Sequence, residues 1–524
     1  MKGGFFIRLI YALNYVKLNL IIKMKYMEIK FCSKNVDEQE IELLFIPVLE
    51  GEKHLSKIVQ DLCYEEEKAI LNRTKKENFI GKQGQVFTIY GDDLTVILFG
   101  FGKENKVDMD DWRKAAGSLI AYLKNYRAKK IGLSAKHWLK GNNNINNFAQ
   151  ALVEGLLLAS YDFIKYKQQD KNKIKIELEE IYIELDNAKK NAFKKAWELG
   201  LLLARGTILA RDLVNEPAGV MTPTFLAETA NAIAKNNKNI SVKILDKERI
   251  EKIGMNAFLS VAEGSEQAAK FIHLIYHPAR VTKKKIAIVG KGITFDSGGL
   301  NIKIGDSMEQ MKIDMGGAAT VLGVFEAIGQ LKLKAEVHGI IAACENMPSG
   351  GALKPGDVVT NMQGKTIEIG NTDAEGRVTL ADSLAYAQKQ GADTIIDLAT
   401  LTGACLVALG TDYAALYAND QALNKSLINA ADKAGEKMWS MPLPVEYKDL
   451  NKSNIADIKN IPSTRYGGSI TAAMFLQEFI KEGVVWAHLD IAGPAYAEKS
   501  FNNYTPIGGV GFGVRTLLEW LQNN

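Results

Sequence analysis

The sequence predicts an α/β protein of two domains. We expect a smaller N-terminal α/β domain and a larger C-terminal domain with a central mixed, mostly parallel sheet that helices cover on both faces. With 524 residues, 47% of them hydrophobic, the chain is too long for one core. Short β-rich runs alternate with helical patterns along most of its length. Several runs in the second half are continuously apolar, which is typical of strands buried on both faces.

The first 26 residues stand apart from this alternation. They are apolar enough to resemble a signal peptide, but Arg8 and Lys17 interrupt the apolar run and no small-residue cleavage site follows. We therefore expect residues 1–26 to form a disordered or loosely docked extension, with Met24 and Met27 as alternative starts. An export signal is the alternative interpretation.

Residues 27–185 have the pattern expected of the smaller domain. Helical patterns occur at 108–126 and 146–161, and strand-like runs occur at 41–48, 85–90, 94–102, 129–135 and 181–185. The apolar period then changes to 3.6 over residues 191–215. We expect residues 186–214 to form a helix that links the two domains.

Residues 215–524 are predicted to form the larger domain. A loop rich in helix-breaking residues, "NEPAGVMTP", comes first. Helical segments then alternate with strand-like runs at 241–245, 271–277, 285–290, 335–344, 394–400 and 486–493. In sheets of this kind ligands bind beyond the carboxyl ends of the strands, so functional residues are expected there.

Charge and cysteine content argue against several classes of protein. The net charge of +4 comes from 65 basic and 61 acidic residues, and the basic runs are scattered, which indicates solvated faces rather than a nucleic-acid surface. The four cysteines include no C-x-x-C pair, so neither a disulfide framework nor a thiolate zinc site is indicated. This cysteine usage fits a reducing cytoplasm. The sequence contains no stretch of eighteen uninterrupted apolar residues, so it predicts no membrane-spanning segment.

Acidic residues and lysines gather where two apolar runs end. The run at 285–290 leads into a predicted loop with Lys291, Asp296, Lys303 and Asp314, and "KTIEIG" leads into "NTDAEGR", which contains Asp373, Glu375 and Arg377. If the two loops converge, four carboxylates face one pocket. Carboxylates held close together repel unless a cation lies between them. Four are more than one ion needs, so we expect two divalent cations that share bridging carboxylates.

The absence of histidine from these two loops indicates which kind of metal site they form. None of the six histidines falls in these loops, which argues against a closed structural zinc site and favours an open, catalytic one. Each piece alone also has an ordinary interpretation, because single acids after strands are often helix caps and the glycines of "DSGG" and "DMGG" are turn residues. "GKG" fits no phosphate-binding pattern, which argues against nucleotide binding.

Taken together, the motifs resemble one known family. "NTDAEGR" with "VGKGITFDSGGLNIK" and "MKIDMGGAATV" closely resembles the leucyl aminopeptidase family, the dinuclear M17 metallo-exopeptidases. The resemblance covers about residues 190–520. It implies an aminopeptidase that releases N-terminal residues, preferably leucine or other apolar ones, from peptides. It also implies a homohexamer and two divalent metal ions per subunit, Mn²⁺ or Zn²⁺.

The resemblance assigns roles to the matching positions. It implies a tighter metal site formed by Lys291, Asp296, Asp314 and Glu375, and a more exchangeable one formed by Asp296, Asp373 and Glu375. It implies that Lys303 and Arg377 are catalytic, with bicarbonate held by Arg377 as the general base. The pocket for the first side chain would lie near Met311, Thr400 and Gly403, with the Leu401 backbone close to the substrate amine.

The residues themselves favour an exopeptidase. A water shared by two dications is a strong nucleophile near neutral pH, and a second metal can take the free α-amine, which an internal peptide bond lacks. Lys291 must then bind as the free amine, with a depressed pKa; an ordinary ion pair with the acids is the alternative. Lys303 is placed to donate to the developing oxyanion.

Arg377 has two interpretations. The apolar spacing after it predicts a helix, so Arg377 should lie in a first helical turn, where free N–H groups favour an anion. The alternative is a salt bridge that steadies Asp373 and Glu375. For the whole chain, the alternative function is a nucleic-acid-binding protein that retains the aminopeptidase fold. The intact set of ligand residues argues for the enzyme.

Overall fold

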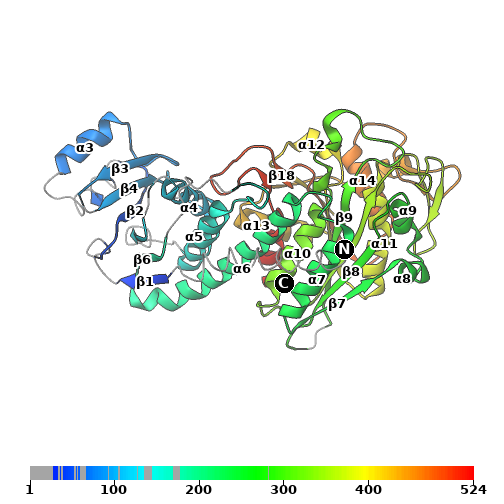
Figure 1. Cartoon of the computed structure of the whole chain (residues 1–524), viewed down its shortest axis with the longest axis horizontal. Helices are drawn as coiled ribbons and strands as arrows, with labels where there is room; N and C mark the ends of the chain where they lie inside the picture. Colours follow the sequence, from blue (N-terminus) through cyan, green and yellow to red (C-terminus); the bar gives the residue numbers. More distant parts are fainter. Residues whose placement is uncertain are drawn as a thin grey trace. The chain divides into compact units, whose positions relative to one another are not determined.

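The computed structural model describes residues 28–32, 36, 39–51, 55, 57–58, 67–92, 94–103, 107–124, 126, 128–134, 144–168, 178–280 and 283–524. The expected extension at 1–26 lies outside the described residues. The chain divides into two compact units, Met1–Ala204 with Ser500–Pro506, and Arg205–Lys499 with Ile507–Asn524. The boundary falls inside the 26-residue helix α6 (Lys190–Asn215), drawn in Figure 1. The predicted α/β class is confirmed.

A six-stranded sheet forms the centre of the first unit. Its order is β1 (Glu28–Cys32), β6 (Glu180–Glu184), β5 (Lys130–Ser134), β2 (Leu43–Val48), β4 (Thr95–Gly100) and β3 (Val86–Tyr90). All neighbours are parallel except β3 and β4. Strands β2 and β4 are buried along their whole length, as their continuous apolar runs predict. The helices of this unit include α3 (Glu67–Lys76), α4 (Met109–Leu123) and α5 (Ile145–Ser160).

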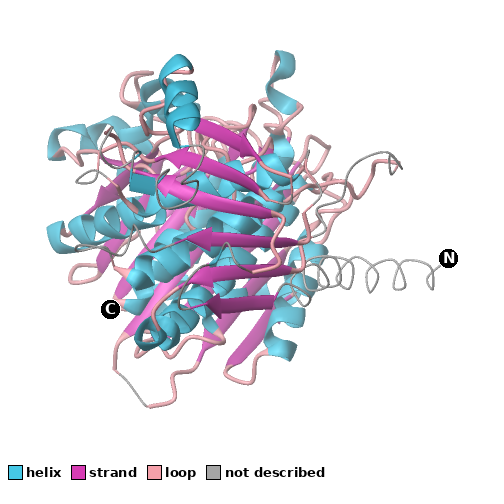
Figure 2. Ribbon diagram, turned by 90° about the vertical axis from the view of Figure 1, so that its left-hand side faces the viewer, coloured by secondary structure: helices cyan, strands magenta, loops and turns pink. Residues whose placement is uncertain are grey.

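An eight-stranded mixed sheet forms the centre of the second unit. Its order is β15 (Met438–Ser440), β14 (Ala414–Ala418), β17 (Val485–Asp490), β13 (Thr394–Ala399), β9 (Lys285–Asp296), β10 (Glu336–Asn346), β8 (Lys270–Tyr276) and β7 (Ile240–Leu245). The middle strands β17, β13, β9 and β10 run parallel to one another. Strands β14, β8 and β7 each add an antiparallel pairing. Figure 2 draws the strands in magenta and the helices in cyan.

Helices cover both faces of this larger sheet. On one side α10 (Gly316–Ile328) packs on β9 and contacts α7 (Pro223–Asn236) and α15 (Val514–Gln522). On the other side α11 (Glu375–Lys389) packs on β9 and contacts α9 (Asn256–Ala262), as Figure 1 shows. The remaining helices are α8 (Lys247–Lys252), α12 (Gly403–Leu409), α13 (Gln421–Ala434) and α14 (Gly468–Gln477). The predicted covering of both sheet faces is therefore confirmed.

Short elements complete the second unit. They include the 3₁₀ turns η4 (Gly305–Met308), η5 (Met311–Ile313) and η6 (Val445–Asn451). The turn η3 (Asn187–Lys189) belongs to the first unit and precedes α6. One small sheet contains β11 (Val358–Thr360), β12 (Thr366–Glu368) and β16 (Ile458–Lys459), and another contains β18 (Tyr496–Ala497) and β19 (Gly508–Gly509). Among the described residues, no helix is long and apolar enough to cross a membrane.

Two strand predictions near the site need correction. The run at 285–290 was expected to end at Gly290, but β9 continues to Asp296, so Lys291 lies within a strand. Gly290 is not a loop residue. It allows α10 to pack closely on the strand, because a Cβ on Gly290 would lie 2.5 Å from the Gly317 carbonyl oxygen at the start of α10. The "KTIEIG" run contributes only the three residues of β12, which belong to a small separate sheet.

Candidate metal centre

The acidic residues reach one place from three segments of the second unit. Lys291 lies in the middle of β9 and Asp296 is its last residue. Asp314 directly follows the turn η5, immediately before α10. Asp373 lies in the turn before α11, and Glu375 is the first residue of that helix. The structure thus brings the two motif segments together, at the carboxyl end of β9.

Lys291 joins two of these segments through its ammonium group. Its Nζ lies 2.8 Å from Asp314 Oδ2 and 2.8 Å from Glu375 Oε1. It also donates to the Thr400 carbonyl oxygen at 3.0 Å. Burial lowers the pKa of Lys291, but the carboxylates of Asp314, Glu375 and Asp296 outweigh it and raise the pKa well above its usual value. A dication beside the amine acts in the opposite direction, which is the depressed pKa expected for a lysine ligand.

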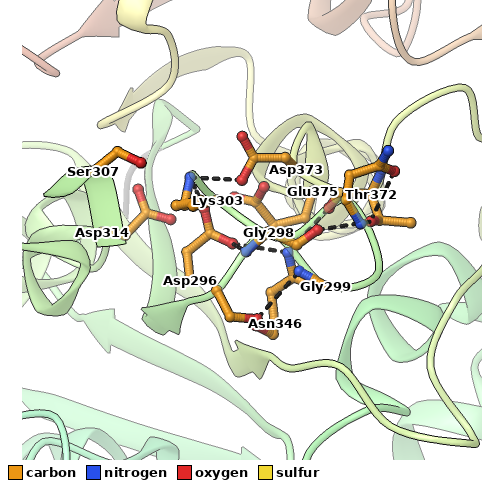
Figure 3. Close-up of polar contacts among 12 residues, drawn as sticks. Asp296, Gly298, Gly299, Lys303, Ser307, Asp314, Asn346, Thr372, Asp373 and Glu375 are labelled. Carbon is orange, nitrogen blue, oxygen red and sulfur yellow. Dashed lines mark hydrogen bonds and ion pairs between the residues drawn. The ribbon is translucent and has the colours of Figure 1, made fainter. Parts of the chain in front are cut away.

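Lys303 bridges the other two acids. Its Nζ lies 2.7 Å from Asp296 Oδ2 and 2.6 Å from Asp373 Oδ1, as Figure 3 shows. Burial lowers the pKa of Lys303, whereas Asp296 and Asp373 raise it further, with a net upward shift. The loop that carries Lys303 turns at Gly298 and Gly299, which have φ of +86° and +63° and so occupy the left-handed region that favours glycine.

The acidic cluster has the features of a divalent cation site. Ligand oxygens of Asp296, Asp314 and Glu375 all lie within 4.8 Å of one another, and the three residues are buried. In the part of the chain that the structure describes, Oε2 of Glu375 is buried with no hydrogen-bond partner, and Asp314 Oδ2 and Asp373 Oδ1 meet lysines at ion-pair distance only. Unpaired buried carboxylate oxygens are costly unless a cation satisfies them. These hard oxygen donors therefore fit divalent metal ions.

Burial and mutual repulsion both disfavour the charged forms of these acids. Burial is the main cause that raises the pKa of Asp314 well above its usual value, with repulsion from Glu375 and Asp296 added and Lys291 opposing it. The pKa of Glu375 rises for the same two reasons, burial first and then Asp296. Burial likewise raises the pKa of Asp373. Cations bound among these carboxylates would reverse these shifts.

The residues expected to bind substrate surround this cluster in part. The Thr400 hydroxyl donates to Asp314 Oδ1 at 2.7 Å. The Leu401 amide donates to Asp490 Oδ1 at 3.1 Å, and Gly403 is exposed at the start of α12, with open space where a Cβ would be. Met311 is half-buried in η5, and its carbonyl accepts from the Asp314 amide at 3.3 Å.

Arg377 lies in the first turn of α11, where the apolar spacing predicts it. It is buried, its Nη1 donates to the Asn460 carbonyl oxygen at 3.0 Å, and its Nε is buried with no hydrogen-bond partner in the described part of the chain. Burial lowers the pKa of Arg377 to about 10. Among the described residues no ion pair joins Arg377 to Asp373 or Glu375, so the guanidinium is held by a carbonyl rather than by the acids.

Sequence reasoning missed two polar residues that organise the site. Asn346 donates to Asp296, and buried Asp490 accepts from the Thr402 hydroxyl at 2.7 Å as well as from the Leu401 amide. Both residues end strands of the central sheet, β10 and β17. The rule that drew attention to Asp296, a polar residue at the carboxyl end of an apolar run, could also have found them.

Comparisons with known proteins identify the family of this chain. The profile of the cytosol aminopeptidase family, catalytic domain, matches residues 208–518, and that of the family's N-terminal domain matches residues 52–170. The chain belongs to the cytosol aminopeptidase family. The "Probable cytosol aminopeptidase" of Persephonella marina is 42% identical over 95% of this chain and 100% of the relative. That of Alkaliphilus oremlandii is 44% identical over 95% and 99%.

Solved structures of similar proteins have the same fold. A mutant of tomato leucine aminopeptidase superposes with a TM-score of 0.86 and 36% identity, covering 95% of this chain and 97% of that one. The bottromycin maturation enzyme BotP in complex with Mn superposes with a TM-score of 0.81 and 33% identity, covering 92% and 99%. Membership of the cytosol aminopeptidase family supports a metal-dependent aminopeptidase that acts on peptides.

Proposed function

We propose that this protein removes leucine or another apolar residue from the N-terminus of peptides, with two divalent ions, Mn²⁺ or Zn²⁺, in each subunit. One observation carries the proposal. Lys291 contacts Asp314 and Glu375 from different segments, while a buried Glu375 oxygen has no hydrogen-bond partner among the described residues. A cluster that needs a cation fits a metallopeptidase better than a surface for nucleic acid.

Five residues would hold the ions. Lys291, Asp296, Asp314 and Glu375 would form the tighter site, and Asp373 would complete the more exchangeable one together with Asp296 and Glu375. Bound ions supply a nucleophilic water at neutral pH and polarise the scissile carbonyl. Lys291 would enter the tighter site as the free amine, giving up its proton as the ion binds.

Lys303 and Arg377 would act on the reacting groups. Released from Asp296 and Asp373, the Lys303 ammonium can donate to the oxygen of the carbonyl under attack, where negative charge develops. Arg377 would hold bicarbonate as the general base, in bidentate fashion. Two observations on the described residues support this role: Arg377 Nε has no hydrogen-bond partner, and no side chain caps the start of α11.

The substrate's first residue would lie beside α12. The pocket would be formed near Met311, Thr400 and Gly403, with the Leu401 backbone close to the α-amine. The open space at Gly403 supports a side-chain pocket there. We further propose that residues 215–524 are the catalytic domain, that 186–214 link it to an N-terminal domain at 27–185, and that six chains assemble into a homohexamer.

The test is metal dependence combined with the requirement for a free amine. Chelation should abolish hydrolysis of a leucyl peptide, and Mn²⁺ or Zn²⁺ should restore it, because the carboxylates serve metal ions. The same peptide with an acetylated amine should not be cleaved. Undiminished turnover by metal-free protein, or efficient cleavage of the acetylated peptide, would contradict the proposal. A series of Leu, Met, Ala and Arg substrates would then measure the preference.

A further inference from the structure

Asn346 ends strand β10 directly beside the end of β9. It pairs with Asp296 in the parallel register, and β9 bulges just before this pair, where Ile293–Asp296 lies opposite Cys344–Asn346. Its carbonyl oxygen accepts from the Ser297 amide at 3.0 Å and from the Ser297 hydroxyl at 2.7 Å. Bulges re-aim side chains, and this one accompanies a buried Asn346 side chain that points at the acidic cluster, as Figure 3 shows.

The side-chain amide of Asn346 connects two segments that carry acidic residues. Nδ2 donates to Asp296 Oδ1 at 2.8 Å and to the Thr372 carbonyl oxygen at 3.0 Å. An amide nitrogen carries two hydrogens, so both are used. One partner is at the end of β9, and the other is the residue immediately before Asp373. Asn346 therefore ties these two segments together from below the acidic residues, alongside the contacts of Thr372 with Asn301 and of Lys303 with Asp296 and Asp373.

The same contacts orient the Asp296 carboxylate. Its Oδ1 accepts from Asn346 and from the Gly298 amide at 2.9 Å, whereas its Oδ2 lies 2.7 Å from Lys303 Nζ. Two neutral donors on one oxygen fix the plane of the carboxylate. They leave Oδ2 turned toward Lys303, which also contacts Asp373.

We propose that Asn346 is a positioning residue for the more exchangeable metal ion. This inference rests on the proposed function, in which Asp296 and Asp373 bind that ion together with Glu375. Asn346 would hold Asp296 and the residue before Asp373 in place through its amide, without touching the ion. The tighter site depends less on Asn346, because Lys291 itself lies against Asp314 and Glu375.

The test uses three variants of the full chain. Asn346→Ala removes both donors, and Asn346→Leu removes them while filling the space, so a cavity effect and a hydrogen-bond effect are separated. Asn451→Ala is the matched control, because Asn451 is equally buried and donates Nδ2 to the Thr471 carbonyl at 2.8 Å. Metal-free protein is titrated with Mn²⁺, and electron paramagnetic resonance follows the free ion and the coupling between two bound ions. Melting temperatures are measured before the ion is added.

Both Asn346 variants should bind the second Mn²⁺ about 10- to 100-fold more weakly, the usual effect of removing an outer partner of a metal ligand. The first ion should bind nearly as in the wild type, and the coupled two-ion signal should fall. Asn451→Ala should lower the melting temperature and leave both affinities unchanged. If both Asn346 variants bind the second ion as tightly as the wild type, the positioning role of Asn346 is wrong, but the two-ion function still stands. The same conclusion follows if both ions are weakened equally. A wild-type chain that takes only one ion would overturn the two-ion function as well.

Discussion

Lys291 packs its side chain so closely on Gly376 that a Cβ at Gly376 would lie 2.5 Å from Lys291 Cε. Such a distance is far below ordinary contact, so any larger residue must displace the lysine. The glycine of the "NTDAEGR" motif therefore makes room for the amine between Asp314 and Glu375.

Gly376→Ala should lower the affinity for the tighter metal ion by at least about 10-fold, since it pushes the Lys291 amine away from the acids. Alanine is normally preferred to glycine in a helix by about 1 kcal/mol, so α11 itself should not be weakened. Metal retention during dialysis against a chelator measures the effect. Gly350→Ala, where a Cβ meets open space, is the matched control. Retention equal to that of the control would contradict the prediction.

Lys303→Met should lower kcat by about 10²- to 10³-fold while both ions stay bound, because the change removes one donor to the developing oxyanion and no metal ligand. Steady-state kinetics with a metal count on the same sample check this. Lys365→Met serves as the control, since Lys365 Nζ forms a comparable ion pair with Glu478 at 2.9 Å. Loss of metal in the Lys303 variant would instead assign the lysine a structural role.

Arg377→Ala should lower kcat by about 10²- to 10⁴-fold with both ions retained, because the variant cannot hold the base. The wild-type rate should fall in bicarbonate-free buffer and recover when bicarbonate is added, whereas the variant should respond weakly. A purely structural guanidinium would show itself as lost metal. Near-normal kcat in a variant that retains both ions would rule out the anion-holding role.

Acid should destabilise the second unit through a buried histidine pair. His273 Nε2 lies 2.9 Å from His338 Nδ1, and His273 Nδ1 lies 3.2 Å from the Tyr386 hydroxyl. Burial, together with repulsion from His338, lowers the pKa of His273 to about 3. The unfolded chain, with a pKa of 6.5, then takes up more protons than the folded one. The contribution of neutral His273 to the free energy of unfolding is fully present above pH 6.5 and is lost as the pH falls toward 3.

Each pH unit inside that window should cost up to about 1.4 kcal/mol of unfolding free energy. Urea unfolding of metal-free protein at pH 7.5 and pH 5.5 measures the slope. His273→Phe should lose less stability between the two pH values than the wild type, whatever its absolute stability. His277→Ala is the control, because His277 is exposed and its removal leaves the buried pair in place. An unchanged slope in His273→Phe would refute the prediction.

Periodicity and residue type predicted much of this molecule. The apolar runs that became β2, β4, β8 and β13 are continuous in sequence, and the start of α11 followed from spacing alone. The continuation of β9 could not be predicted in this way. Gly290 and Gly292 look the same in sequence whether they make a turn or allow a close approach, and only the approach of α10 to Gly290 and of β10 to Gly292 decides between them.

The missed residues have a similar explanation. Asn346 and Asp490 act through partners that lie 50 and 89 residues away in the chain, Asp296 and Leu401. Their position at the end of an apolar run marks them as candidates, but local patterns contain no signal for the pairings themselves. The acidic motif was recognisable because its charges are concentrated in a few consecutive positions, whereas the residues that hold those charges in place are single polar side chains at strand ends.

Strand β9 has parallel partners on both edges and a helix against each face. Its amides should therefore be among the slowest in the second unit to exchange with deuterium, because they open only when the whole sheet separates. Lys291 and Asp296 lie on this strand, so heat or denaturant cannot release them while the sheet persists. Loss of these two residues from the site should thus coincide with denaturation of the second unit.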